Sequence, residues 1–194
     1  IAKFRAVRRV YAKLMRERFG AKNPESMRLR FHCQTAAASL TKPQPKINIV
    51  RTGLQALAAV LGGAQSLHTN GMDEAFAIPT EEAMKIALRT QQIIADETGV
   101  ASVADPLGGS YFVECLTTQF EQEIFGVLDE VERRGGTVKL IEEGWFQQRI
   151  ADFAFDTVKR KASGDKPVIG VNRHVEPDER FDVEIHPYDP TTAE

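Results

Sequence analysis

The first hydrophobic residues of the chain recur at three- and four-residue steps, which is the spacing of one face of an α-helix. We expect this helix to end by Gly20, because glycine readily terminates helices. The face consists of Ile1, Phe4, Val7, Val10, Tyr11, Leu14 and Met15.

A strand and a helix are then predicted twice in succession. Residues 27–33 alternate between polar and apolar, which predicts a strand, and a second strand is expected over 64–70. A helix over about Asn48–Leu61 lies between them, and Pro79 and Thr80 open another that Gly99 stops. This order favours a parallel sheet covered by helices. The first of these helices is expected to bury Ile49, Val50, Leu54, Leu57 and Leu61.

The remaining chain is predicted to be mainly helical. A loop over 101–110 precedes a long helix over about 110–134, for which Ser110 is a natural cap. Helices over about 138–143 and 146–162 follow, and PVIGVN and FDVEIH are short strand candidates. From residue 176 the tail resembles an exit into a linker. The stripe of the long helix is Phe112, Val113, Leu116, Phe120, Ile124, Leu128 and Val131.

Both strand candidates carry polar side chains on one face. A solvated face is the simpler interpretation. A closed barrel would instead turn this face inward, where unpaired polar groups cost about 1–3 kcal/mol each, so that a polar, elongated ligand would have to fill the lumen. The periodicity leaves both interpretations open. The residues are Arg30, His32 and Gln34 in the first strand and Ser66, His68 and Asn70 in the second.

Composition narrows the choice of partners and compartment. The 194 residues, 42% hydrophobic, indicate a globular protein, and 25 basic against 27 acidic residues argue against nucleic acid as a partner. We find neither a membrane span nor a secretion signal. Cys33 and Cys115 have no CxxC partner, so we expect reduced, buried thiols and a cytoplasmic location. Because the chain opens with Ile1 already in helical periodicity, we expect a segment of a longer protein.

Eight strings carry a family resemblance. RLRFHCQT, SLT, NIVRT, GGAQSLHTN, DEA, PT, ADPLGGSY and VIGVN follow one another here. In order and approximate spacing they resemble the adenosylcobalamin-dependent acyl-CoA mutases, the methylmalonyl-CoA mutase family. The resemblance implies an α/β fold, the C-terminal portion of a (β/α)8 TIM barrel with additional C-terminal helices. Residues 1–175 would belong to that acyl-CoA-binding barrel, and 176–194 to a tail leading to a linker.

The resemblance implies part of a coenzyme B12-dependent isomerase that rearranges acyl-CoA thioesters through a radical 1,2-shift. The pantetheine arm of the substrate would lie along the barrel axis, against the polar strand faces. The implied partners are the acyl-CoA, the remaining barrel segment and a cobalamin-binding domain or small subunit, in a homo- or hetero-oligomer. EEGWFQQRIADFAF and HCQTAAASL are more similar to isobutyryl-CoA mutase large subunits, which favours slightly a branched or hydroxylated acyl-CoA over methylmalonyl-CoA.

Residue roles follow from the same resemblance. Asn70 and Glu74 would meet the ribose of the deoxyadenosyl group, and the backbone near Ala77 the corrin. Gln34 and Ala37 would also approach the corrin, although Ala36–Ala38 stand where methylmalonyl-CoA mutases commonly carry SGW. The residues implied beside the pantetheine and thioester are His32, Gln65 and Ser66.

Other features are assigned no chemistry. No histidine lies in the DxHxxG motif that supplies the cobalt ligand, so no metal ligand is assigned, and no catalytic residue is assigned within this chain. The glycines of ADPLGGSY lack the lysine of a phosphate-binding P-loop, so Asp105 is expected to brace a structural loop. Trp145 is expected to be a packing anchor. A non-catalytic barrel segment acting as a scaffold for a partner chain is the alternative function.

Overall fold

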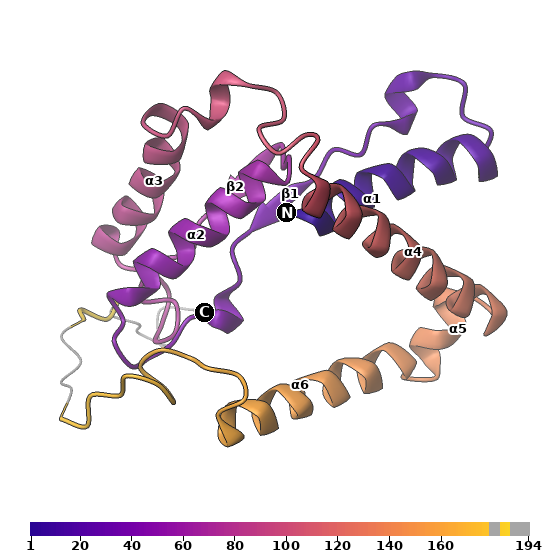
Figure 1. The fold of residues 1–194 in the computed structure, drawn as a ribbon. Helices are drawn as coiled ribbons and strands as arrows, with labels where there is room; N and C mark the ends of the chain where they lie inside the picture. The colour runs from indigo at the N-terminus through magenta and orange to yellow at the C-terminus, as the bar shows by residue number, and fades with distance from the viewer. Residues whose placement is uncertain (179–182, 187–194) are drawn as a thin grey trace, which may run out of the picture.

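Residues 1–178 and 183–186 are described by a computed structural model, which is α/β and mostly helical (Figure 1). The helices lie close to their predicted positions, and the strands are shorter than predicted. They are α1 (Ala2–Lys13), β1 (His32–Gln34), α2 (Ile47–Leu61), β2 (Ser66–His68), α3 (Glu81–Asp96), α4 (Tyr111–Arg133), α5 (Thr137–Glu142) and α6 (Trp145–Ser163).

The two strands pair in parallel, with His32 opposite Ser66 and Gln34 opposite His68. Helix α2 makes the crossover between them, and α3 follows β2 and packs against α2. The predicted strand, helix, strand, helix order is therefore confirmed. It is a βαβα unit, the building block of parallel α/β folds.

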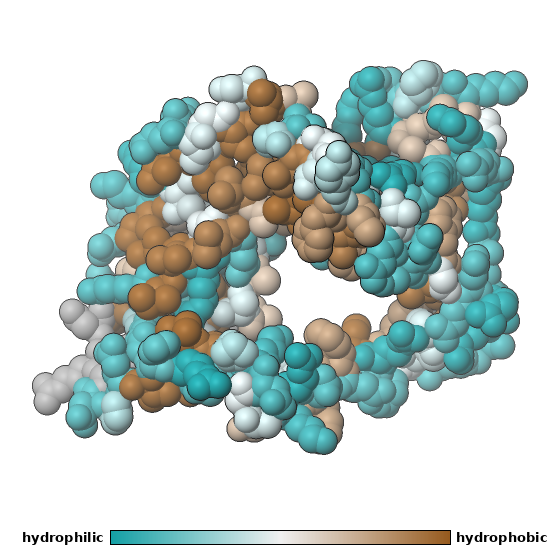
Figure 2. All heavy atoms as spheres, viewed as in Figure 1, coloured by the Kyte–Doolittle hydropathy of each residue, from teal (hydrophilic) through white to brown (hydrophobic). Residues whose placement is uncertain are grey.

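Helices α4 to α6 form an arm. Helix α4 runs beside α1, α5 reverses the chain, and α6 returns at a distance from the strands (Figure 1). Figure 2 shows an opening through the molecule between α6 and the remaining elements. No residue of α6 is buried, and its closest packing is on α5. The arm thus contributes little to the core of the described residues.

The predicted buried face of α2 was wrong in part. Val50 and Leu54 are 57% and 66% exposed, because the side facing the protein carries smaller residues. The residues of this inner face recur at helical spacing, and their small size lets the helix approach its neighbours closely. A Cβ at Gly53 would meet Thr90 of α3 at 3.7 Å. The buried residues of α2 are Asn48, Thr52, Ala56 and Ala59.

The first strand is shorter than the predicted 27–33. Residues Pro24–Met27 form a 3-10 turn that Asn23 caps, and Glu25 forms ion pairs with Arg28 and Arg30. The ladder therefore begins only where β2 lies opposite, at the Gln65 N–H bond to the Phe31 carbonyl, 3.2 Å.

PVIGVN is not a strand. Residues 168–173 form a turn, closed by a bridge between Ile169 and Arg173, in which Gly170 has a φ of 80° that favours glycine. The other candidate, FDVEIH, lies partly outside the described residues, and its residues 183–186 have no regular structure.

Two burial expectations also fail in the C-terminal half. Phe112 is 75% exposed and Cys115 is exposed, because α4 turns Thr117 and Glu121 toward α1 instead. Cys33 is half-buried, and both thiols are free. Ser110 stands at the expected N-cap position of α4, but its side chain makes no capping hydrogen bond.

Candidate functional site

The polar face of the strand pair is held by hydrogen bonds between its own side chains. His32 Nδ1 and Ser66 Oγ lie 2.7 Å apart across the register. Gln65 Oε1 accepts the Phe31 N–H at 2.8 Å, and its Nε2 donates to the Gly63 carbonyl at 2.8 Å. His32, Gln65 and Ser66, the predicted substrate residues, therefore lie together at the start of the ladder, exposed in this chain.

Asn70 organises the opposite end of the pair and is 2% exposed. Its Oδ1 accepts from Thr35 Oγ1 at 3.0 Å and from Gln34 Nε2 at 3.3 Å, and its N–H donates to Thr35 Oγ1 at 3.0 Å. Its Nδ2 is buried without a partner among the described residues. A buried donor without an acceptor is costly, so Asn70 Nδ2 stands out as an unsatisfied polar atom at this end of the strand pair.

The turn between β2 and α3 is fixed by a buried carboxylate. Asp73 Oδ2 accepts the Thr80 N–H at 2.7 Å and the Thr80 hydroxyl at 3.0 Å, while Thr80 caps α3. A Cβ at position 71 would lie 2.5 Å from Asp73 Oδ1, so a residue larger than glycine would displace this buried carboxylate. The predicted cofactor residues Glu74 and Ala77 lie half-buried within this closed turn.

Ala37 lies in a separate turn that is held by its own hydrogen bonds. It begins a 3-10 turn, Ala37–Ser39, and is exposed. Gln55 of α2 holds this turn from both sides: its Oε1 accepts the Ala36 N–H at 2.6 Å, and its Nε2 donates to Ser39 Oγ at 2.6 Å. The small side chain leaves the backbone of this turn open to approach.

A basic cavity of about 400 Å³ opens beside the start of the ladder, lined by Arg8, Arg28, Arg30, Gln65, Met27 and Leu29. Arg28 and Arg30 share a single carboxylate, Glu25, so the positive charge of the lining exceeds the negative. Arginine guanidinium groups match the oxygens of phosphates. Alternation along 27–33 predicts Arg30 on the polar strand face, but only the fold brings Arg8 of α1 to the same cavity as Arg28 and Arg30.

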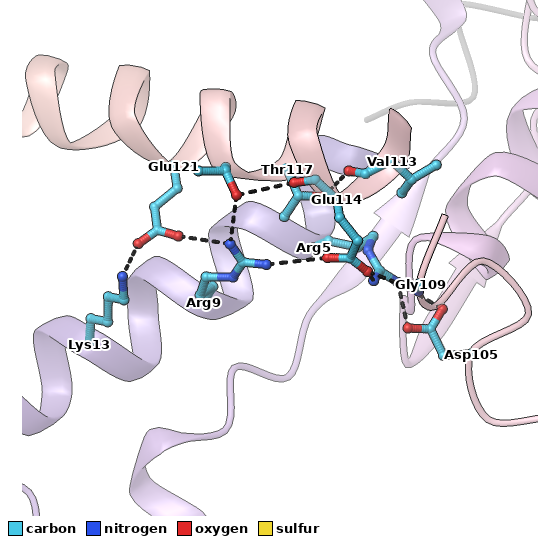
Figure 3. A network of polar contacts seen from close by, with 10 residues as sticks. Arg5, Arg9, Lys13, Asp105, Gly109, Val113, Glu114, Thr117 and Glu121 are labelled. Carbon is cyan, nitrogen blue, oxygen red and sulfur yellow. Dashed lines mark hydrogen bonds and ion pairs between the residues drawn. The ribbon is translucent and has the colours of Figure 1, made fainter. Parts of the chain in front are cut away.

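An ion network fastens α1 to α4 (Figure 3). Arg5 pairs with Asp105 and Glu114, both at 2.6 Å, and Glu121 accepts from Lys13 and from Arg9 at 3.2 Å. The Arg5 bond lowers the pKa of the Asp105 carboxyl, and the Lys13 and Arg9 bonds lower that of Glu121. Asp105 therefore braces the ADPLGGSY loop by tying it to α1.

Trp145 contacts cations at the base of the arm. The guanidinium groups of Arg134 and Arg149 lie 5.5 and 4.8 Å from its ring centroid, and Phe146 packs edge-on at 4.8 Å. These contacts join the end of α4 to the start of α6, as expected of an anchor.

Two other kinds of site are absent from the described residues. The part of the chain that the structure describes holds no cluster of three or more metal-ligating side chains. Within the same residues, no helix combines the length and apolarity that a membrane crossing needs.

The sequence matches known proteins along its whole length. Residues 1–194 match the family profile described as methylmalonyl-CoA mutase. The chain is 75% identical to the 2-hydroxyisobutanoyl-CoA mutase large subunit of Aquincola tertiaricarbonis over 194 residues, 100% of this chain and 34% of that protein. It is 47% identical to the mitochondrial methylmalonyl-CoA mutase of Homo sapiens over 174 residues, 90% of this chain and 23% of that protein.

A bacterial methylmalonyl-CoA mutase, from Cereibacter sphaeroides, is 44% identical over 176 residues, covering 89% of this chain and 24% of that protein. The chain thus spans only about a quarter to a third of the length of these curated relatives.

Proposed function

The chain belongs to the methylmalonyl-CoA mutase family, and we propose that it forms part of a coenzyme B12-dependent isomerase that interconverts acyl-CoA thioesters by a radical 1,2-carbon-skeleton rearrangement. One observation carries the proposal beyond the family: the polar strand face runs from an arginine-lined cavity at one end to Asn70 at the other, whose buried amide nitrogen has no partner among the described residues. Such a face suits an elongated ligand with phosphates at one end and a reacting group near the other.

The substrate side of the proposal concerns the first half of this face. A CoA thioester carries phosphates and then an amide-rich pantetheine arm. Arg8, Arg28 and Arg30 offer charge for the phosphates, and the exposed His32 and Ser66 offer hydrogen bonds to the arm. Gln65 would contribute with its remaining lone pair and N–H, since one of each is already used within the chain.

The cofactor side concerns the second half, and the residues there fit adenosylcobalamin. Asn70 has a free amide donor and Glu74 a half-buried carboxylate, the groups that would hold ribose hydroxyls. Gln34 and the small residues Ala37 and Ala77 would border the corrin. When bound, the cofactor supplies a carbon-centred radical by homolysis of its cobalt–carbon bond. This chain's own residues would orient the ribose and exclude water from it.

The proposed architecture is the C-terminal portion of a (β/α)8 barrel, with residues 1–175 in the barrel domain. The remaining strands would close the channel over His32 and Ser66, which are exposed here. The relative of Aquincola tertiaricarbonis is a large subunit, which supports a partner: we propose a small subunit or domain that binds cobalamin. Two free cysteines support the cytoplasm as its location, although the human relative is mitochondrial.

We propose a branched or hydroxylated acyl-CoA as the substrate, because identity to the 2-hydroxyisobutanoyl-CoA mutase subunit is 75%, against 47% to the human methylmalonyl-CoA mutase. Turnover of 2-hydroxyisobutanoyl-CoA, isobutyryl-CoA and methylmalonyl-CoA by the holoenzyme tests this. A kcat/KM highest for methylmalonyl-CoA would contradict it.

Replacing Glu74 by Gln in the holoenzyme tests the cofactor site. Losing a charged hydrogen bond to the ribose should weaken adenosylcobalamin binding about tenfold or more, measured by absorbance titration of the apoenzyme. Glu82→Gln, an exposed glutamate in the first turn of α3, is the matched control and should leave the affinity unchanged. Equal affinities in the Glu74 variant and the parent protein would remove the assignment.

The alternative, a non-catalytic scaffold, draws support from the open strand face and from the exposed apolar residues of α6. It would be favoured if the isolated chain proved a monomeric, cooperatively folding protein and if Glu74→Gln had no effect on cofactor affinity in the assembled protein.

A further inference from the structure

Two strings whose roles remain open, NIVRT and VIGVN, meet in the structure. NIVRT lies in the first turns of α2, and VIGVN forms the turn after α6. They are more than a hundred residues apart in sequence, yet one arginine side chain joins them: Arg51 Nη2 donates to the Ile169 carbonyl at 2.7 Å.

Asn48 lies at the centre of this contact and is fully buried. Its Nδ2 donates to the carbonyls of Thr41 at 2.8 Å and of Met72 at 3.0 Å. Its Oδ1 accepts the Thr41 N–H at 3.1 Å and Arg51 Nη1 at 2.8 Å. Every hydrogen-bonding position of the amide is thus used. Because Met72 precedes Asp73, Asn48 holds the start of the turn that Asp73 and Thr80 close at its other end.

Hydrogen bonds also fix the turn after α6, on the other side of this contact. Asn172 Nδ2 donates to the Lys161 carbonyl near the end of α6 at 2.8 Å, and its Oδ1 accepts the Val168 N–H at 2.7 Å. A second bond joins the same regions: Gln44 Nε2 donates to the His174 carbonyl at 2.8 Å. The turn after α6 is therefore a shaped element with a fixed carbonyl, Ile169, for Arg51.

We propose that Arg51 is a positioning residue. Through Asn48, it fixes the position of the β2–α3 turn, which carries Glu74 and Ala77, relative to the segment that follows α6. The cofactor role of that turn rests on the proposed function. The path consists of three hydrogen bonds, Ile169 to Arg51, Arg51 to Asn48 and Asn48 to Met72. A displacement of the C-terminal segment is thereby transmitted to the residues proposed to meet the ribose.

The chemistry of arginine explains why this residue type is required. Its planar fork donates in two directions at once, from Nη1 to Thr41 Oγ1 and Asn48 and from Nη2 to Ile169. Lysine keeps the charge but presents one compact ammonium group, which cannot span both sets of acceptors. Arg51→Lys therefore breaks the hydrogen-bonded connection while keeping the positive charge.

The experiment uses the full-length protein with Arg51→Lys. A second variant, Asn172→Ala, disturbs the turn that presents the Ile169 carbonyl to Arg51. Hydrogen exchange of the apoenzyme should accelerate about tenfold at amides 71–77 in both variants, with α4 amides unchanged. Adenosylcobalamin affinity should fall about three- to tenfold, as expected for the loss of one or two hydrogen bonds. Arg89→Lys, an exposed arginine of α3, is the matched control.

A double-mutant cycle with Glu74→Gln separates positioning from general stability. If Arg51 acts through the turn, the two losses of cofactor affinity are not additive. Unchanged exchange at 71–77, acceleration that is equal in every helix, or additive losses would each overturn the proposal. Were exchange at 71–77 faster while neither Arg51→Lys nor Glu74→Gln altered cofactor affinity, the proposed function itself would be wrong.

Discussion

At the scale of single residues, the buried polar groups do more than the apolar ones to shape the candidate site. Asn48, Asn70 and Asp73 are at most 2% exposed, and all lie around the β2–α3 turn. The side chains of Asn48 and Asp73 hydrogen-bond backbone groups, and that of Asn70 accepts from the side chains of Thr35 and Gln34. A hydrocarbon side chain could do neither, because it neither donates nor accepts. A preorganised turn of this kind is what a bound cofactor requires.

Asp73→Ala should lower the free energy of unfolding by about 1–3 kcal/mol, because the buried Thr80 N–H loses its acceptor. Urea denaturation of the full-length protein measures this. Asp129→Ala, which removes an exposed aspartate of α4, should change stability by less than about 0.5 kcal/mol. Similar losses in the two variants would contradict a stabilising role of Asp73 in the turn.

At the scale of elements, the α1–α4 contact depends on charge. Glu121 has a lowered pKa, first because of the Lys13 bond and then because of Arg9. A carboxyl whose pKa is lower in the folded than in the unfolded protein stabilises the fold above its ordinary value of 4.5. That contribution is lost as the pH falls through the lowered pKa.

Glu121→Gln should therefore flatten the fall in stability below about pH 4.5, since the titrating group is gone. At pH 7 the loss should be about 1 kcal/mol, because Arg9 and Lys13 are 38% and 46% exposed and can regain water. Thermal unfolding from pH 3 to 7 measures both effects. An unaltered pH profile would show that Glu121 does not contribute.

The sequence predicted the elements well, because helical periodicity, caps and glycine stops are local signals. Thr80 caps α3, and Gly99 adopts the left-handed conformation just after it. Burial was predicted less well. Val50 and Leu54 are the more hydrophobic residues of α2, so periodicity assigned them inward, whereas tertiary packing selected Asn48, Thr52 and the alanines. Which face meets the protein depends on partners that periodicity does not contain.

The residues of the candidate site also divide into those that local sequence signals predict and those that only the fold brings together. The polar faces of β1 and β2 followed from alternation, whereas the contacts of His32 with Ser66 and of Gln34 with Asn70 come from the parallel register of the fold. Arg8 and Arg51 could not be identified as site residues from alternation, because their partners are remote in sequence. PVIGVN contains β-branched residues and was therefore interpreted as a strand, but Gly170 and Asn172 form a turn.

At the scale of the whole molecule, the described residues leave apolar side chains exposed on several helices, including those on two surfaces. One is the outer side of α2, with Val50 and Leu54. The other is on α6 and includes Ile150 and Phe153, 69% and 71% exposed. Apolar patches of this kind mark surfaces that other protein covers.

The isolated chain should therefore self-associate and bind a hydrophobic dye, and Ile150→Glu with Phe153→Glu should reduce both effects by about half or more. Light scattering and dye fluorescence measure the two. Gln148→Glu, on the polar half of α6, serves as a control for the added charge. A monomeric, dye-free parent chain would contradict the prediction.

The parallel strand pair also bears on how this chain folds. His32 and Ser66 are 34 residues apart, so no tight hairpin can start the sheet, and ordering that long connection costs entropy before any pairing repays it. Strands of three residues each cannot repay it alone. Collapse of α2 onto its neighbours must accompany pairing, which makes the alanines of its inner face candidates for the rate-limiting nucleus.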